Sequence, residues 1–164
     1  MSTQSPPNTP WSLAGKTAIV TGGSRGIGQA IAIQLARKGP TKLAITYAAN
    51  TEAAEATLQV CRGLGVEEAV AIQADALDSK FGPKVLFQVL ERLGTKVVDI
   101  LVNNAALADG SKALPIKDTT VDNFLQIMQA NVFAPISLTT ALLRHLPAYG
   151  GRIILSTVRV EGRF

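Results

Sequence analysis

The sequence predicts an α/β fold in which helices cover both faces of a doubly wound, Rossmann-like parallel sheet of about five strands. Short apolar runs rich in β-branched residues alternate along the chain with longer stretches of helical periodicity. The run at 98–104 (VDILVNN) is typical of a strand that is buried on both faces. Strands separated by helices pair in parallel through right-handed crossovers, so these observations together favour a parallel sheet.

The strands are expected where an apolar run is bounded by turn residues. In chain order these runs are 17–20 (TAIV), 42–47 (KLAITY), 69–74 (AVAIQA), 98–104 (VDILVNN) and 152–156 (RIILS).

The first two helices are predicted from periodicity and composition. Ile27, Ile31 and Leu35 recur every four residues within 27–38, which predicts a helical face. Residues 51–62 are rich in alanine and carry two glutamates in the first turn, where acidic side chains complement the helix dipole.

The last two helices are predicted from their start signals. Gly82-Pro83 opens a helix that runs through Leu93, since proline is tolerated in a first turn. Thr119 and Asp122 resemble a capping box for a long helix that continues to about Leu146.

A chain of 164 residues is long enough for one domain with a buried core. Residues 1–13 are polar and broken by prolines, which predicts a disordered tail. We expect the Rossmann-like domain over 14–157, whereas 158–164 fit no predicted element. The N-terminal segment has neither the apolar region of a signal peptide nor an Arg-rich amphipathic pattern, and no run approaches the ~20 apolar residues of a membrane span.

Charge and cysteine content narrow the expected partners. The formal net charge is +4, but the Lys and Arg residues are scattered without interleaved aromatics, so no nucleic-acid partner is predicted. The single cysteine, Cys61, excludes an internal disulfide and suits a reducing compartment. We therefore expect a cytoplasmic protein with no membrane partner, and no metal site is predicted.

The segment TGGSRGIG (21–28) lies between the first predicted strand and helix. Gly22 allows a tight turn there, while Gly26 and Gly28 let the helix start close to a ligand and to the sheet. The free N–H groups and the dipole at such a helix end favour a pyrophosphate. The alternative is a glycine-rich turn without a ligand, but the position between strand and helix favours dinucleotide binding.

The spacing Thr-Gly-x-x-x-Gly-x-Gly resembles the short-chain dehydrogenase/reductase family, and further landmarks follow in that family's order over about 14–157. Asp75 stands where the family contacts adenine, Asn103-Asn104-Ala105-Ala106 stands for its Asn-Asn-Ala-Gly, and Asn131 stands for its catalytic Asn. The resemblance implies a ketoreductase-type or 3-oxoacyl-reductase-like enzyme that transfers a hydride between a nicotinamide and a small carbonyl or alcohol. The cofactor contacts that it implies are at Gly22, Ser24, Arg25, Gly26, Ile27, Gly28, Tyr47, Asp75, Ala76, Asn103 and Ala105.

The preferred nicotinamide is predicted to be NADP(H), with NAD(H) as the alternative. NAD enzymes place an acidic residue near the end of the second strand to hold the ribose 2′-OH, but 46–50 (TYAAN) contains no carboxylate. Arg25 in the glycine turn can instead pair with a 2′-phosphate through its planar fork. The alternative reading of Arg25 is an ordinary exposed cation.

Asn131 and Pro135 lie four residues apart in the long predicted helix. Because proline has no N–H, it cannot donate to the carbonyl of Asn131, so this carbonyl is left free and a kink is expected. In the family this carbonyl holds a water of the proton relay. The alternative is that Pro135 only bends the helix around the sheet.

The family's catalytic Tyr-x-x-x-Lys does not occur in the sequence, since Tyr47 is followed four residues later by Thr51 and Tyr149 by Ile153. The family's catalytic Ser is also uncertain in position. Counting from Gly151 places it at Val158, or at Thr157 beside Ser156 if one residue is missing, so Ser156 is the candidate carried forward. His145 is expected to be a surface or helix-terminal cation rather than a base.

The resemblance also implies two strands beyond 152–156, seven in all, and a helix that carries Tyr and Lys. Without them this strand would be an exposed apolar edge. We therefore expect the sequence to be the N-terminal, cofactor-binding part of a longer reductase and to be inactive alone. Family members often form homo-oligomers through the long helix and the helix that is missing here, so only half of that contact is expected. An inactive nucleotide-binding or interaction protein is the alternative. The sequence does not identify the substrate, and only the loop 107–117 is left as a pocket rim.

Overall fold

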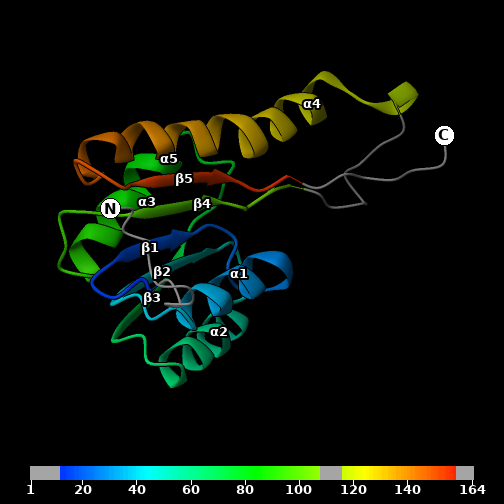
Figure 1. Cartoon of the computed structure of the whole chain (residues 1–164). Coiled ribbons are helices and arrows are strands. Elements are labelled where there is room, and N and C mark those ends of the chain that lie inside the picture. The colour runs from blue at the N-terminus through cyan, green and yellow to red at the C-terminus, as the bar shows by residue number, and fades with distance from the viewer. Residues whose placement is uncertain (1–11, 108–115, 158–164) are drawn as a thin grey trace, which may run out of the picture.

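A computed structural model describes residues 12–107 and 116–157, and it contains one five-stranded sheet in the order β3-β2-β1-β4-β5 with all neighbouring pairs parallel (Figure 1). The strands are β1 Thr17–Val20, β2 Lys42–Tyr47, β3 Glu68–Gln73, β4 Ile100–Asn103 and β5 Arg152–Leu155. The predicted fold class is confirmed, and each predicted strand is present within two or three residues of its expected ends.

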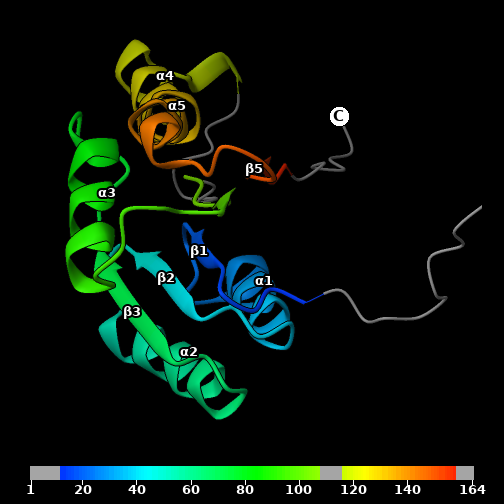
Figure 2. The ribbon, with the colours of Figure 1, turned by 60° about the vertical axis from the view of Figure 1, so that its left-hand side comes forward.

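Helices cover both faces of the sheet (Figure 2). One face carries α1 (Gly26–Ala36) and α2 (Thr51–Gly63), and the other carries α3 (Phe81–Arg92) and the long helical segment. Alternate strand residues point to the two layers: Ala18 and Val20 belong to the core under α1 and α2, whereas Ile19 belongs to the core under α3. All four residues of β4 are buried, as expected for a strand covered on both sides.

The buried face of α1 differs from the predicted one. The sequence pointed to Ile27, Ile31 and Leu35, but Ile27 is 54% exposed and the other two are only partly buried. The fully buried positions are one residue further along, at Gly28, Ala32 and Ala36. At Gly28 no side chain fits, because a Cβ there would lie 2.1 Å from the carbonyl oxygen of Gly22 in the turn that follows β1.

The long helical segment is divided into four parts. These are α4 (Val121–Met128), a π-helical turn η2 (Gln129–Phe133), α5 (Ala134–Leu142) and a short 3₁₀ turn η3 (Leu143–His145). The predicted start is off by one residue, because the cap is Thr120, whose hydroxyl accepts the N–H of Asn123 at 3.1 Å. A further 3₁₀ turn, η1 (Ile116–Asp118), precedes this helix.

The two ends of the described chain differ in packing. Leu13, which the sequence assigned to the tail, is buried in the core under α1, and its N–H donates to the carbonyl of Lys38 at 2.8 Å. The rest of the predicted tail and the segment 158–164 lie outside the described residues. At the other end, β5 is an edge strand with Ile154 47% and Leu155 64% exposed, as expected. Within the described parts of the chain, no helix is both long and apolar enough to cross a membrane.

Candidate functional site

The predicted site residues gather at the carboxyl ends of the strands, around the point where the sheet order reverses. The chain leaves β1 toward β2 and β3 on one side and returns to β4 and β5 on the other. In open α/β sheets, the crevice beyond the strand ends at such a reversal is where ligands bind. The glycine turn follows β1 at this point, and the segment after β4 lies directly beside it.

The glycine turn is fixed to the end of β2 and closes tightly on itself. The N–H groups of Gly22 and Gly23 donate to the hydroxyl and the carbonyl of Thr46, at 3.1 and 2.9 Å. A Cβ at Gly28 would lie only 2.1 Å from the carbonyl oxygen of Gly22, so no side chain fits there. Gly26 has φ +57, but nothing lies within 4 Å of its Cβ position, which leaves the helix start open to a ligand.

Thr21 joins the glycine turn to the segment after β4. Its buried hydroxyl accepts the N–H groups of both Asn104 and Ala105 at 2.9 Å. In return, the amide Nδ2 of Asn104 donates to the carbonyl of Thr21 at 3.0 Å. The two halves of the site are therefore held as one rigid unit by backbone and amide hydrogen bonds.

Asn103 is the last residue of β4, and its side chain points toward α5. Its Nδ2 donates to the hydroxyl of Thr139 at 3.1 Å, while its buried Oδ1 has no partner among the described residues. A small cavity of about 10 Å³ lies against it, lined by Thr21, Ala76, Phe81, Asn103, Ala105, Ala130, Ala134 and Pro135. This volume is close to the minimum for one water molecule, and the unpaired oxygen supplies a polar wall.

Asp75 and Ala76 follow β3 at the same edge of the sheet. Asp75 is exposed, and one of its two carboxylate oxygens accepts the N–H of Leu77 at 2.9 Å. This bond stabilises the local turn after β3. The next acidic residue, Asp78, has its pKa lowered, first by the hydrogen bond from the side chain of Lys84 and then by the backbone N–H of Lys80. These bonds fix the turn that leads into α3.

The remaining predicted cofactor residues occupy different surroundings. Arg25 is exposed, has extended backbone as the residue before α1, and its guanidinium makes no hydrogen bond or ion pair within the described residues. Ile27 is exposed beside it, and Ser24 contributes its carbonyl to a bond with Thr57. Tyr47 is 9% exposed and belongs to the core, and its hydroxyl accepts that of Thr51 at 3.3 Å. Its side chain is therefore directed away from the open surface.

Asn131 lies in the π-helical turn, which confirms that the helix is distorted near Pro135. Its side chain forms two hydrogen bonds to the backbone of Leu107, to the N–H at 2.7 Å and to the carbonyl at 3.2 Å. The N–H of Ala134 bonds to Gln129, five residues back, so the carbonyl of Ala130 loses its usual donor. The donor one residue further on is Pro135, which has no N–H, so two successive carbonyls, those of Ala130 and Asn131, lose the donor four residues ahead.

Ser156 lies at the same sheet edge, where its N–H donates to the carbonyl of Asn103 at 2.9 Å. Thr157, the other assignable position for the family's Ser, is exposed, and Val158 lies outside the described residues, as does most of the predicted rim loop 107–117. His145 is remote from the site, since its ring contacts the carbonyl of Lys96 at 3.0 Å before β4. Asn131 and Ser156 thus both bond to the chain at or just after the end of β4, at Leu107 and Asn103, whereas His145 does not.

Three residues that organise the site were not among the predicted site residues: Thr21, Thr46 and Asn104. Thr21 and Asn104 stand within the two family-like motifs, whereas the only signal for Thr46 was its position near the carboxyl end of a predicted strand. Within the described ranges, no group of three or more His, Cys, Asp or Glu side chains is arranged to hold a metal ion.

Comparison with known proteins agrees with this geometry. Residues 16–160 match the family model described as short chain dehydrogenase. The short chain dehydrogenase penD of Penicillium thymicola is 54% identical over 145 residues, which are 88% of this chain and 52% of that protein. The short chain dehydrogenase asqE of Emericella nidulans is 56% identical over 88% of this chain and 54% of its own. The chain therefore spans about half the length of these curated relatives.

Two solved structures with bound cofactor are similar to this one. A short chain dehydrogenase from Burkholderia cenocepacia in complex with NADP has a TM-score of 0.77 and 42% identity, over 87% of this chain and 55% of its own. A blue fluorescent protein from a metagenomic library in complex with NADPH has a TM-score of 0.77 and 39% identity, over 88% of this chain and 56% of its own.

Proposed function

Since the chain belongs to the short-chain dehydrogenase/reductase family of oxidoreductases, we propose that it forms the cofactor-binding half of an NADP(H)-dependent enzyme that reduces a small carbonyl compound or oxidises the corresponding alcohol. When bound, the nicotinamide would supply a hydride to the carbonyl carbon, and the carbonyl oxygen would take up a proton. The observation that carries the proposal is the rigid unit of glycine turn and post-β4 segment, placed at the reversal point of the sheet.

The residues present fit a dinucleotide. At the start of α1, Gly26 leaves open space over free N–H groups, which suits a pyrophosphate. The exposed side chain of Ile27 borders the same surface, and Asp75 keeps one carboxylate oxygen available at the end of β3 for the adenine. Asn103 and Ala105 would bound the cofactor from the other side of the reversal point.

The preference for NADP(H) over NAD(H) is proposed from charge. The end of β2 and the residues after it present Ala48, Ala49 and Asn50, and the first carboxylate is Glu52 in the first turn of α2. The position near the end of β2 that holds the ribose 2′-OH in NAD enzymes therefore carries no carboxylate to repel a 2′-phosphate. Arg25 supplies an exposed guanidinium without a protein partner in the described part of the chain. The NADP and NADPH complexes of the two similar structures support this choice.

Asn131 and Ser156 are the proposed catalytic positions. Asn131 would present its backbone carbonyl, freed by Pro135, to a water of the proton relay, while its side chain holds the post-β4 segment at Leu107. Ser156 would polarise the substrate carbonyl from the end of β5. The sequence contains no Tyr-x-x-x-Lys to supply the proton, so we propose that these 164 residues alone turn over nothing.

The missing acid is also the observation that favours a second candidate, an inactive nucleotide-binding or interaction protein. Both candidates predict cofactor binding and no turnover by these 164 residues alone; they differ in whether a longer protein that contains this chain turns over substrate. NADPH oxidation by the isolated chain with a panel of ketones should stay at background, and turnover above background would contradict the proposed inactivity.

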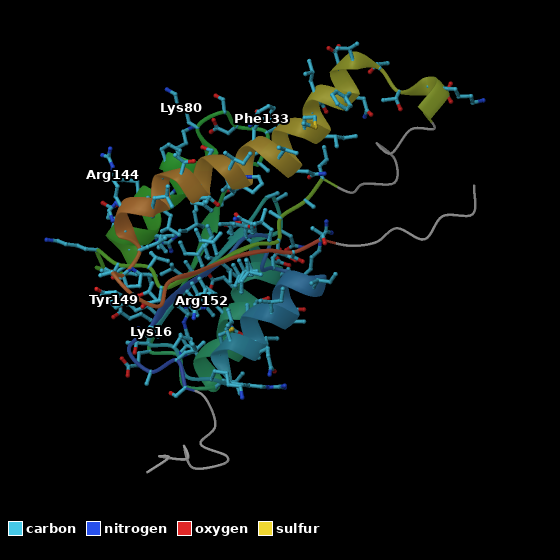
Figure 3. The ribbon with its side chains drawn as sticks, turned by 45° about the horizontal axis from the view of Figure 1, so that its top comes forward. Lys16, Lys80, Phe133, Arg144, Tyr149 and Arg152 are labelled. Carbon is cyan, nitrogen blue, oxygen red and sulfur yellow. The ribbon has the colours of Figure 1, made fainter. Side chains whose placement is uncertain are left out.

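We also propose a cytoplasmic location and self-association through the long helical segment. Its outer surface carries exposed apolar side chains, and Figure 3 shows Phe133 on the side away from the sheet. These side chains are Val121, Phe124, Leu125, Phe133, Ile136 and Leu143. Exposed apolar side chains of this number on one helical segment favour a protein contact. Sedimentation that shows the same monomer for the native chain and for Phe133→Asp would contradict the proposed association.

The cofactor proposal is tested by calorimetric titration of the chain with NADPH and NADH. We expect NADPH to bind at least about tenfold more tightly, as a charge-assisted phosphate contact should give. Arg25→Ala should reduce this preference to less than about threefold. Arg37→Ala, at the far end of α1, is the matched control and should leave it unchanged. Equal affinities in the native chain, or an unchanged preference in Arg25→Ala, would refute the NADP(H) assignment.

A further inference from the structure

A fully buried hydroxyl on α2 faces the glycine turn from the neighbouring helix. Thr57 has no exposed surface and lies in the middle of α2, a helix that packs beside α1. Burying a hydroxyl away from water is costly unless it is hydrogen-bonded. The partners of Thr57 therefore indicate what the hydroxyl is for.

Two of the three partners of Thr57 belong to the glycine turn and the first turn of α1. The side-chain amide of Gln29 donates to the Thr57 hydroxyl at 2.9 Å. That hydroxyl is 3.4 Å from the carbonyl of Ser24 and 3.0 Å from the carbonyl of Ala53 in its own helix. The hydroxyl has one hydrogen, which the carbonyls of Ala53 and Ser24 share, and the shorter contact to Ala53 is the ordinary helical one for a threonine. The contacts with Gln29 and Ser24 are the two that connect separate segments.

These two connections lie on either side of Arg25. Ser24 precedes Arg25 in the chain, and the backbone N–H of Gln29 donates to the carbonyl of Arg25 at 3.2 Å. Arg25 itself has extended backbone and is followed by Gly26 with φ +57, a residue with wide conformational freedom. The direction in which the Arg25 side chain leaves the turn therefore depends on contacts outside the turn. Thr46 holds the turn before Arg25, at Gly22 and Gly23, and Thr57 holds the residues on both sides of Arg25.

We propose that Thr57 and Gln29 are positioning residues that hold Arg25 against the 2′-phosphate of the cofactor and so determine the preference for NADP(H). This inference rests on the proposed function. The guanidinium has no partner of its own within the described residues, so its placement must come from the backbone. A backbone held from both neighbours reduces the conformational entropy that Arg25 loses when it binds the phosphate.

The test compares 2′,5′-ADP with 5′-AMP, two cofactor fragments that differ in the 2′-phosphate. Calorimetry gives the ratio of their dissociation constants for the native chain and for Thr57→Val, which keeps the shape of the side chain and removes the hydroxyl. We expect Thr57→Val to lower the preference for 2′,5′-ADP by about five- to tenfold, the range of one or two lost hydrogen bonds, with little change for 5′-AMP. Thr57→Ser restores the hydroxyl and should restore the preference.

Two further variants serve as a second test of the link and as a control. Gln29→Leu removes the same link from α1 without altering the buried position, and it should lower the preference in the same direction if Thr57→Val folds poorly. Thr17→Val removes a buried threonine hydroxyl at the opposite end of β1 and should leave the ratio of affinities unchanged.

The outcomes separate this inference from the proposed function. If Arg25→Ala lowers the preference but Thr57→Val and Gln29→Leu do not, the positioning role is refuted and the NADP(H) assignment stands. If Thr57→Val weakens both ligands equally, Thr57 only supports the fold, and the inference is likewise refuted. If Arg25→Ala itself does not change the preference for 2′,5′-ADP, the proposed contact between Arg25 and the 2′-phosphate is refuted, and this inference is refuted with it.

Discussion

Replacing Gly82 by alanine tests how closely α3 and α5 are packed. Gly82 is the second residue of α3, and a Cβ built there would lie 2.3 Å from the carbonyl carbon of Ser137 and 2.4 Å from the backbone nitrogen of Leu138. Ordinary contact begins near 3.4 Å, so the two helices must separate by about 1 Å. The opposing atoms are backbone, so no side chain can rotate to relieve the clash.

The expected cost of Gly82→Ala follows from this geometry. Overpacking of a tight core costs about 1–3 kcal/mol, and here the separation also loosens the contacts of Leu138, which has no exposed surface. We expect a loss of about 2–3 kcal/mol in the free energy of unfolding. For a chain of this length, that corresponds to a decrease of roughly 4–12 °C in the melting temperature.

The assay for Gly82→Ala is equilibrium unfolding in urea followed by circular dichroism, with a thermal melt on the same samples. Gly63→Ala is the matched control, since Gly63 is also helical and has nothing within 4 Å of its Cβ position. Alanine should be neutral there or stabilise by up to about 1 kcal/mol. A Gly82→Ala variant within about 0.5 kcal/mol of the native chain would refute the claim that the two backbones are in contact.

Two further predictions concern the glycine turn and the buried thiol. Gly28→Ala places a Cβ 2.1 Å from the carbonyl of Gly22, so we expect a loss of at least about tenfold in NADPH affinity; calorimetry that finds native affinity would contradict this. Burial raises the pKa of Cys61 above its ordinary 9.0, and the charge of nearby Arg62 offsets this only in part. The unfolded chain therefore releases this proton first, so this contribution to stability is complete below pH 9 and is lost as the pH rises through the folded pKa. Stability measured against pH should fall more steeply above pH 9 in the native chain than in Cys61→Ala, and parallel curves would exclude the effect.

Local chemistry explains why much of the fold was predictable. Each strand is a run of β-branched or aliphatic residues, and the glycine turn is recognisable because φ above zero and close approach both require glycine. The distortion near Asn131 was predicted from one covalent fact, the missing N–H of Pro135. The form of the distortion was not predicted, because a π-helical turn at 129–133 and a simple kink are both compatible with the missing donor.

Contacts between distant segments could not be predicted in this way. The sequence indicated Gly82 only as a helix start, yet in the structure it is the point where two helix backbones meet. It assigned α1 a buried face of large side chains, but the buried positions are Gly28 and two alanines, and at Gly28 the carbonyl of Gly22 leaves no room for a side chain.

The sequence by itself therefore determined the order of strands and helices, the glycine turn and the missing backbone donor at Pro135. These depend on properties of single residues and their near neighbours along the chain. Only the tertiary structure decided that the hydroxyl of Thr21 ties the glycine turn to Asn104 and that Thr57 reaches Ser24 from another helix. Such contacts join residues 33 and 83 positions apart, and they depend on interhelical and interstrand distances that sequence spacing does not specify.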